Sequence, residues 1–267
     1  QLVAGLAGRC RFVVLCRADA GELRRRLGDR VDWEFAPPAT RGWLFRSIWE
    51  RLNLARLARR RGAAIYFTPS GIAAHLPAEV AQIVFCQNPW ALVPAARRRR
   101  DALKAWLQRR AYRRAMRVAA AMVFNSRYMQ DAYRANAGFA EKRGRVVHQA
   151  ADEATRERAA AGQTLPRRPA LILAVSVMAP HKNIEALARA FAEVRARHAE
   201  ARLVLAGSWP DAAYERKIRA LIEELGLREA VEFAGFVARE QLDGLYAAAR
   251  VFCLMSRCES FGIPAIE

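Results

Sequence analysis

Short apolar runs alternate along the chain with longer segments in which apolar residues recur every three or four positions. In the first half this pattern predicts strands at 11–16, 31–35, 64–68, 82–86, 119–124 and 146–147, and helices at 43–61, at 97–117 and after Ser126. In the second half it predicts strands at 171–177, 202–206, 231–234 and 251–255, and helices at 184–198, 212–225 and 239–248. Continuous apolar strands that alternate with amphipathic helices indicate parallel sheets covered on both faces. We therefore predict an α/β protein.

The segment 151–169 divides the two alternating halves. It lacks apolar periodicity and contains Gly162, Pro166 and Pro169, which are typical of a linker. We predict two facing, doubly wound, Rossmann-like domains at residues 1–160 and 170–267, with a ligand site in the cleft between them. The chain has no initiating Met, and the helix predicted to open at 261–267 stops at once, so we expect both domains to be incomplete.

Positive charge is concentrated in the first half. Residues 1–168 carry 33 basic and 13 acidic side chains, whereas residues 169–267 carry 12 and 13. The basic segment 97–117 is interpreted either as a peripheral contact with an anionic membrane or as a solvated helix face. Arginine makes up 41 of the 45 basic residues, so base-composition bias is an alternative source of the charge. No aromatic-rich basic sheet or recognition helix is predicted, so we expect no nucleic-acid partner.

The cysteines and histidines predict no metal site. The five cysteines are odd in number and contain no C-x-x-C pair, and the four histidines are scattered. We interpret the cysteines as reduced thiols of a cytoplasmic protein, with a peripheral place on the inner face of the cytoplasmic membrane as the alternative. The longest charge-free runs have seventeen residues and contain prolines, so no membrane span is predicted.

The loop 176–183 is the first candidate binding element. Lys182 immediately precedes a predicted helix whose N-cap we expect to be Asn183, and a lysine beside a helix N-terminus suits a phosphate. A solvated loop lysine is the alternative. Gly207 and Gly235 each follow an apolar strand, where a glycine permits either close approach to a ligand or a turn.

Two carboxylates form the second candidate element. Glu259 and Glu267 are separated by seven residues, and the backbone N–H groups near Phe261 and Gly262 would open the helix between them. One carboxylate can accept hydrogen bonds from both hydroxyls of a sugar diol. The arrangement therefore indicates recognition of a sugar phosphate, with acids that complement a helix dipole as the alternative.

Taken together, residues 171–267 resemble the donor-binding domain of glycosyltransferase family 4. The resemblance depends on the lysine loop, on AGS and FAGFV after two strands, and on SRCESFGIPAIE, which contains the Glu-x7-Glu signature. It implies the B-type fold of two facing Rossmann-like domains, and transfer with retention of configuration. The first half matches the acceptor domain in layout only, through CQNPWALVP, VFNSRYM and VVHQAAD.

The resemblance also implies a role for each candidate residue. Lys182 would neutralise the diphosphate of a nucleotide-sugar, Glu259 would contact the transferred sugar, and Glu267 would hold the ribose diol. The remaining predicted donor-site positions are Ser176, Asn183, Gly207, Phe236, Val237, Ser260, Phe261 and Gly262, with the base bordered by the backbone of Phe236 and Val237. A GDP- or UDP-sugar is the implied co-substrate, and neither a metal nor a cofactor is implied.

The predicted function is a retaining glycosyltransferase that acts in polysaccharide or glycolipid biosynthesis, with a glycan or lipid-linked acceptor. Mannose is the favoured sugar. Many family members carry an arginine five residues before the lysine, where this chain has Val177. Val177 therefore motivates one alternative, a catalytically inactive partner of the same fold. Another sugar-nucleotide enzyme, such as an epimerase, is a further alternative. His75 and His148 are interpreted as structural residues.

Overall fold

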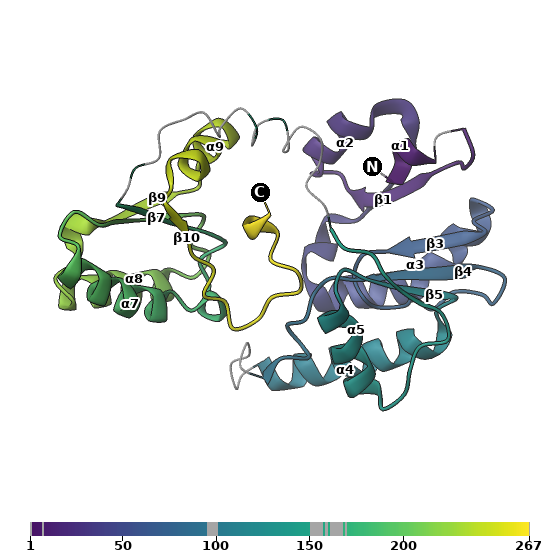
Figure 1. The fold of residues 1–267 in the computed structure, drawn as a ribbon. Coiled ribbons are helices and arrows are strands. Elements are labelled where there is room, and N and C mark those ends of the chain that lie inside the picture. The colour runs from purple at the N-terminus through teal and green to yellow at the C-terminus, as the bar shows by residue number, and fades with distance from the viewer. Residues whose placement is uncertain are drawn as a thin grey trace.

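Figure 1 shows two α/β units, with the C-terminal segment of the second unit running across toward the first. The structure is a computed structural model, and it describes residues 2–6, 8–94, 101–149, 157, 160, 168 and 170–266. The predicted linker at 151–169 therefore falls almost entirely outside the described residues. No helix in the described ranges combines the length and the apolar character needed to cross a bilayer.

The second unit contains one parallel sheet with helices on both faces. Its strands are β7 (Leu171–Val175), β8 (Arg202–Ala206), β9 (Val231–Gly235) and β10 (Val251–Phe252), in the order β10-β7-β8-β9. The helices are α7 (Ile184–Arg197), α8 (Ala212–Glu224) and α9 (Arg239–Ala248). Alternate residues of β8 point to opposite faces, so Leu203 packs with α7 and α8 while Val204 packs with α9.

The first unit contains two separate parallel sheets. The larger one consists of β3 (Ile65–Thr68), β4 (Ala81–Cys86), β5 (Ala121–Phe124) and β6 (Gly144–Val146), in that order, and the smaller one pairs β1 (Val13–Arg17) with β2 (Asp32–Ala36). Its helices are α1 (Leu2–Gly5), α2 (Gly21–Leu27), α3 (Trp43–Arg60), α4 (Ala102–Val118) and α5 (Arg127–Ala137). Tyr112 of α4 stacks on Tyr133 of α5 at 4.7 Å between ring centroids, in the buried core beside Phe124.

The described elements confirm the α/β alternation expected from the apolar pattern. The strand predicted at 251–255 is shorter and ends at Phe252. The helix predicted at 97–117 begins at Ala102, with Asp101 as its N-cap residue, and the predicted positions 97–100 lie outside the described residues. In place of the helix expected at 261–267, the described residues form a single 3₁₀ turn, Ile263–Ala265, after Gly262.

Both predicted N-cap residues occupy that position, but only one of them caps its helix through the side chain. Ser126 is confirmed, because its Oγ accepts a hydrogen bond from the backbone N–H of Met129 at 3.2 Å. Asn183 is the N-cap residue of α7, as predicted, but its side chain makes no capping hydrogen bond. Asn183 has a left-handed backbone, with φ of 59°, because the 3₁₀ helix Pro180–Lys182 runs directly into α7 and the chain must turn sharply there.

Candidate functional site

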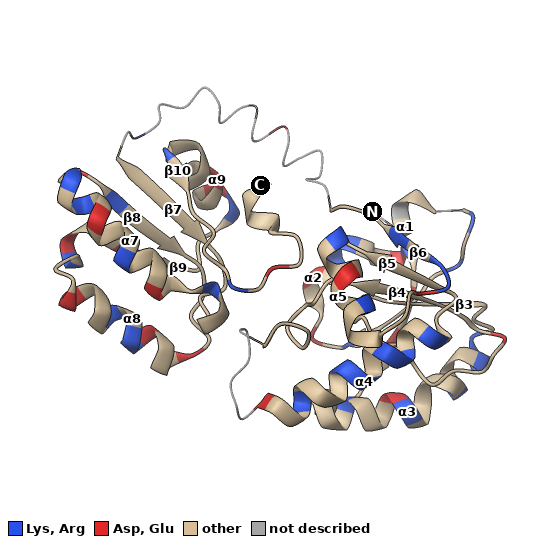
Figure 2. Cartoon of the chain, turned by 60° about the horizontal axis from the view of Figure 1, so that its bottom comes forward, with Lys and Arg blue, Asp and Glu red and all other residues tan. Residues whose placement is uncertain are grey.

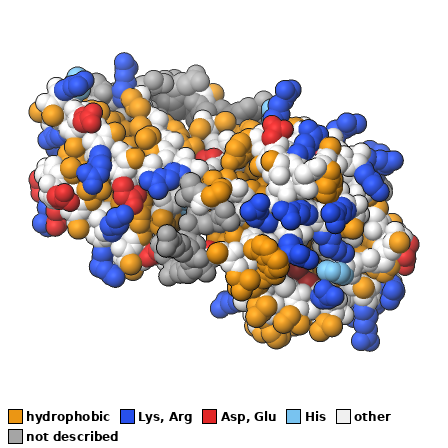
Figure 3. All heavy atoms as spheres, turned by 90° about the horizontal axis from the view of Figure 1, so that it is seen from below, with side chains coloured by type: hydrophobic (Ala, Val, Ile, Leu, Met, Phe, Trp, Pro, Cys, Tyr) orange, Lys and Arg blue, Asp and Glu red, His pale blue; other side chains and the backbone are white. Residues whose placement is uncertain are grey.

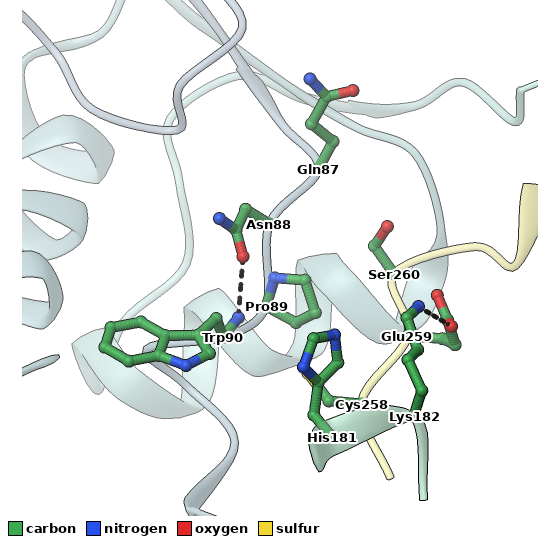
Figure 4. A pocket seen from close by; sticks show the side chains of 9 residues that line it. All are labelled: Gln87, Asn88, Pro89, Trp90, His181, Lys182, Cys258, Glu259 and Ser260. Atoms are coloured by element: carbon green, nitrogen blue, oxygen red, sulfur yellow. Dashed lines mark hydrogen bonds and ion pairs between the residues drawn. The ribbon is translucent and has the colours of Figure 1, made fainter. Parts of the chain in front are cut away.

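A pocket of about 330 Å³ lies between the two units. Loops that follow β4, β7 and β10 line it. Figure 4 shows the side chains of its lining. The lining residues are Gln87, Asn88, Pro89 and Trp90 from the first unit, and His181, Lys182, Cys258, Glu259 and Ser260 from the second. The carboxyl edges of parallel strands are the usual ligand-binding edges of such sheets, so this pocket is the candidate site.

Lys182 and Glu259 form an ion pair on one wall of this pocket. The Lys182 Nζ donates a hydrogen bond to Oε1 of Glu259 at 2.5 Å, and the two side chains are 16% and 28% exposed. Limited exposure strengthens the attraction, because less water screens the two charges. An ammonium has three N–H donors, so two remain for a ligand after this contact.

His181 lies between the ion pair and Trp90 in Figure 4. Partial burial lowers the pKa of its imidazole below the ordinary 6.5, and the adjacent Lys182 charge lowers it further. His181 is therefore neutral at neutral pH, and one ring nitrogen can donate a hydrogen bond while the other accepts one.

Cys258 contributes a thiol that stays protonated. Burial raises its pKa, and the neighbouring Glu259 carboxylate raises it further. A thiol in this state is a poor nucleophile and a poor metal ligand. Among the described residues, no group of three or more His, Cys, Asp or Glu side chains is placed to hold a metal ion.

Polar contacts tie the loop that carries Glu259 to the first unit. The fully buried Asn125 donates from Nδ2 to Oγ of Ser260 at 2.9 Å, and Ser126 donates from Oγ to the backbone oxygen of Ser260 at 2.6 Å. The next residue, Phe261, lies 5.9 Å from His148 between ring centroids. The position of Glu259 therefore depends on the first unit as well as on its own sheet.

A second group of predicted residues lies where β7, β8 and β9 end. The backbone N–H of Ser176 donates a hydrogen bond to the carbonyl oxygen of Ala206 at 3.1 Å, and the backbone N–H of Gly207 donates one to the carbonyl oxygen of Gly235 at 2.7 Å. A Cβ at position 207 would collide with the carbonyl oxygen of Ser176, and φ there is +142°. Glycine at 207 therefore serves close packing of the strand ends.

The structure brings only part of the predicted site together. Lys182, Glu259 and Ser260 line the pocket, and Phe261 and Gly262 follow them directly. Ser176, Asn183, Gly207, Phe236 and Val237 are absent from the pocket lining, and Glu267 lies outside the described residues. Phe236 is 86% exposed, whereas Val237 packs against the core beside α9. The roles assigned to these residues stay predictions.

Sequence reasoning missed the first unit's contribution to the site. Trp90, Asn88 and Asn125 belong to no motif that predicts chemistry, and their segments match the acceptor domain of the family in layout alone. One signal was present, since each of these polar segments directly follows an apolar strand that ends at Cys86 or Phe124. Polar residues that follow buried parallel strands are candidates for a site, and the pattern marks both loops.

Two known families match the chain. The family described as Glycosyltransferase Family 4 matches residues 1–155, and the family described as Glycosyl transferases group 1 matches residues 155–267. Alpha-D-kanosaminyltransferase of Streptomyces kanamyceticus is 28% identical over 242 residues, which are 82% of this chain and 60% of that protein. Mannosylfructose-phosphate synthase of Agrobacterium fabrum is 35% identical over 102 residues, which are 36% of this chain and 22% of that protein. The chain thus spans less than two thirds of the length of these relatives.

A solved structure is similar over nearly the whole chain. The crystal structure of Anabaena HepE in complex with UDP and glucose has a TM-score of 0.62 and 18% identity, and the match covers 94% of this chain and 68% of that one. At this identity the likeness concerns the fold. It confirms the predicted class of an α/β protein with two facing Rossmann-like domains.

Proposed function

Because the chain belongs to glycosyltransferase family 4, we propose that it transfers a sugar from a nucleotide-sugar to a hydroxyl of a glycan or lipid-linked acceptor. The observation that carries this proposal is the Lys182–Glu259 pair, which lies in a pocket that both units line. A cation for a diphosphate and a carboxylate for sugar hydroxyls stand side by side there. The opposite wall, formed by residues 87–90, supplies room and polar groups for an acceptor.

The donor chemistry follows from the charges of the pocket. As the bond between the sugar and the diphosphate breaks, negative charge grows on the leaving phosphate oxygen, and in this proposal the ammonium of Lys182 stabilises it. The neutral imidazole of His181 can donate a hydrogen bond beside it. Glu259 accepts hydrogen bonds from sugar hydroxyls and fixes the orientation of the anomeric carbon.

Transfer with retention requires the acceptor hydroxyl to attack from the side of the leaving group. In the proposed step the bond from the anomeric carbon to the diphosphate breaks, a bond to the acceptor oxygen forms, and the hydroxyl proton passes to the departing phosphate. Lys182 and the backbone N–H groups after Ser260 supply the electrostatic stabilisation in this proposal, so no metal ion or cofactor has a part in it.

The donor is proposed to be a UDP- or GDP-sugar. The related HepE structure holds UDP and glucose, which supports the uridine nucleotide. The name of the related mannosylfructose-phosphate synthase supports mannose as the sugar. The five free cysteines support a cytoplasmic place for the reaction, because thiols persist in a reducing compartment.

Donor binding without transfer is a second candidate function. Val177 is 55% exposed in the loop that follows β7, at the position where many family members carry an arginine. An apolar side chain there leaves the diphosphate with one cation fewer. A protein of this kind would act as an inactive partner of a transferase.

Thermal shift and donor hydrolysis with UDP-, GDP- and ADP-sugars test the proposal. We expect one donor to stabilise the protein and to be hydrolysed slowly, and we expect Lys182→Ala and Glu259→Ala to abolish both effects. Lys217→Ala is the matched control, because Lys217 is an exposed lysine of α8 paired with Glu185 outside the pocket. Stabilisation without turnover would favour the inactive partner, and no response to any donor in the folded protein would contradict both functions.

A further inference from the structure

Two neighbouring helices of the first unit present apolar side chains to solvent. On α3, Leu44, Ile48 and Leu52 are exposed, with Leu52 71% exposed. On α4, Leu103 and Trp106 are exposed in the same way, with Leu103 69% exposed. An ordinary surface helix turns such a stripe toward the core, so these residues require an explanation.

In each helix, the residues that pack against the core are other residues than those of the exposed stripe. In α3 the buried residues are Leu54 and Ala58, and in α4 they are Ala105, Tyr112, Ala115 and Met116. Positions 44, 48 and 52 follow one another at a spacing of four and therefore form one line along α3. These outward stripes are additional to the apolar residues that hold the helices in the fold.

The two stripes belong to one surface. Figure 2 shows α3 and α4 side by side. Burial lowers the pKa of His75, and the charges of Arg114 on α4 and Arg51 on α3 lower it further, so both helices lie close to this histidine. In Figure 3 apolar side chains gather on the underside of the first unit, with Lys and Arg around them. We define the apolar–arginine surface as Leu44, Ile48, Leu52, Leu103, Trp106 and Leu107, with the exposed Arg51, Arg56 and Arg110 beside them.

The charge of this surface is almost entirely positive. α3 contains five arginines and one acid, Glu50, and α4 contains five arginines, one lysine and no acid. The Arg110 guanidinium lies over the ring of Trp106, 5.1 Å from its centroid. An indole with a cation beside it suits the boundary between a hydrocarbon layer and water, because its ring is apolar and its edge is polar.

We propose that the apolar–arginine surface docks the protein onto an anionic lipid bilayer. Leucine, isoleucine and tryptophan side chains would enter the acyl boundary while the arginines contact lipid phosphates. A second copy of the chain fits less well, since a symmetric contact would set these arginines against one another. The proposal does not depend on the transfer reaction, and it extends the membrane contact expected for 97–117 to α3.

Flotation with vesicles tests this docking. We compare phosphatidylcholine vesicles with vesicles that contain about 30% phosphatidylglycerol, and we expect binding to the second kind only. The double variant Ile48→Asp/Leu52→Asp should weaken binding at least about ten-fold. Leu23→Asp, the same change at an exposed apolar position on α2, is the matched control and should bind normally.

Two charge variants keep the test decisive if the double variant fails to fold. Arg56→Gln and Arg110→Gln should each weaken binding about five-fold, and added salt should weaken wild-type binding. Equal affinity for both vesicles, or for neither, would overturn the proposal. The proposal would also be overturned if the wild type forms a dimer in solution and does not bind vesicles, and if the double variant is a monomer. Binding of UDP to each variant is measured in parallel, so that failure of the proposed transferase function is recognised separately.

Discussion

Asn125 and Ser260 connect the two units across 135 positions of the chain through a hydrogen bond of 2.9 Å. Ser126 reinforces this contact by donating to the backbone oxygen of the same serine. Because Ser260 directly follows Glu259, the carboxylate in the pocket is positioned by side chains of both units. A substitution at the end of β5 should therefore change the position of the Glu259 carboxylate on the opposite wall of the pocket.

Two substitutions of Ser126 separate its two roles. Ser126→Ala removes both the cap of α5 and the contact with Ser260, and should lower the free energy of unfolding by about 1 kcal/mol. Ser126→Asp keeps an oxygen that can cap the helix but cannot donate to Ser260. We expect Ser126→Asp to retain most of the stability in urea unfolding, while donor hydrolysis falls in both variants. Normal hydrolysis in both would show that the contact with Ser260 has no part in the site.

Glu259→Gln should separate nucleotide binding from transfer. The substitution releases Lys182 from its ion pair, so UDP without a sugar should bind about five-fold more tightly by calorimetry. Transfer should fall about 10²-fold, because the amide is a weaker acceptor for sugar hydroxyls. Glu259→Asp keeps the negative charge on a shorter side chain and is the control for Glu259→Gln. Weaker UDP binding by Glu259→Gln would contradict the proposed competition for Lys182.

His181 should couple nucleotide binding to pH. In the free protein its pKa lies below 6.5, and a diphosphate beside the ring would favour the charged imidazolium and raise that pKa. UDP binding should therefore take up protons, and should strengthen relative to His181→Gln as the pH falls from about 7.5 to about 5.5. Protonation of UDP itself affects both proteins equally. Calorimetry in buffers of different ionisation enthalpy measures the uptake, and identical uptake by the variant would exclude His181.

The same lowered pKa affects stability with a definite sign. Below 6.5 the unfolded chain binds a proton at His181 more readily than the folded chain does. The contribution of His181 is therefore fully present above that pH and is lost as the pH falls through the lowered folded pKa. Urea unfolding of wild type and His181→Gln across this range measures the difference.

Gly207 should tolerate substitution worse than Gly235. Both have positive φ, but a Cβ at 207 meets the carbonyl oxygen of Ser176, whereas a Cβ at 235 meets no atom within 4 Å. Gly207→Ala should lower the free energy of unfolding by about 3 kcal/mol, and Gly235→Ala by about 1 kcal/mol. Thermal and urea unfolding give both values, and equal losses would mean that the strand ends relax around the added methyl group.

Much of the fold was predictable because its signals are local. Apolar runs and helical spacing identify the strands and helices, and Ser126 is a good N-cap residue at the start of a helix. Asn183 has the same chemical preference, but the preceding 3₁₀ helix imposes a backbone conformation that the local pattern does not specify. A residue type indicates where a helix starts without specifying how the chain enters it.

The site was predictable only where one short motif carries it. Lys182 and Glu259 come from two such motifs, and the structure places them in contact. Asn125 lies 135 positions from its partner, and no local pattern encodes that pairing. The sequence pattern also does not predict that the apolar stripes of α3 and α4 face solvent. Helical spacing indicates that residues share one side of a helix, but it does not indicate which side packs against the core.

The basic residues of the apolar–arginine surface are arginines, and this choice has a chemical consequence. A guanidinium stays protonated across the whole range of pH met inside cells, so acidification cannot release the protein from lipid through these groups. Acetylation of lysine, which removes charge from many basic surfaces, has no target at Arg51, Arg56 or Arg110. Salt and the lipid composition of the bilayer are therefore the controls that we expect to set how long the protein stays there.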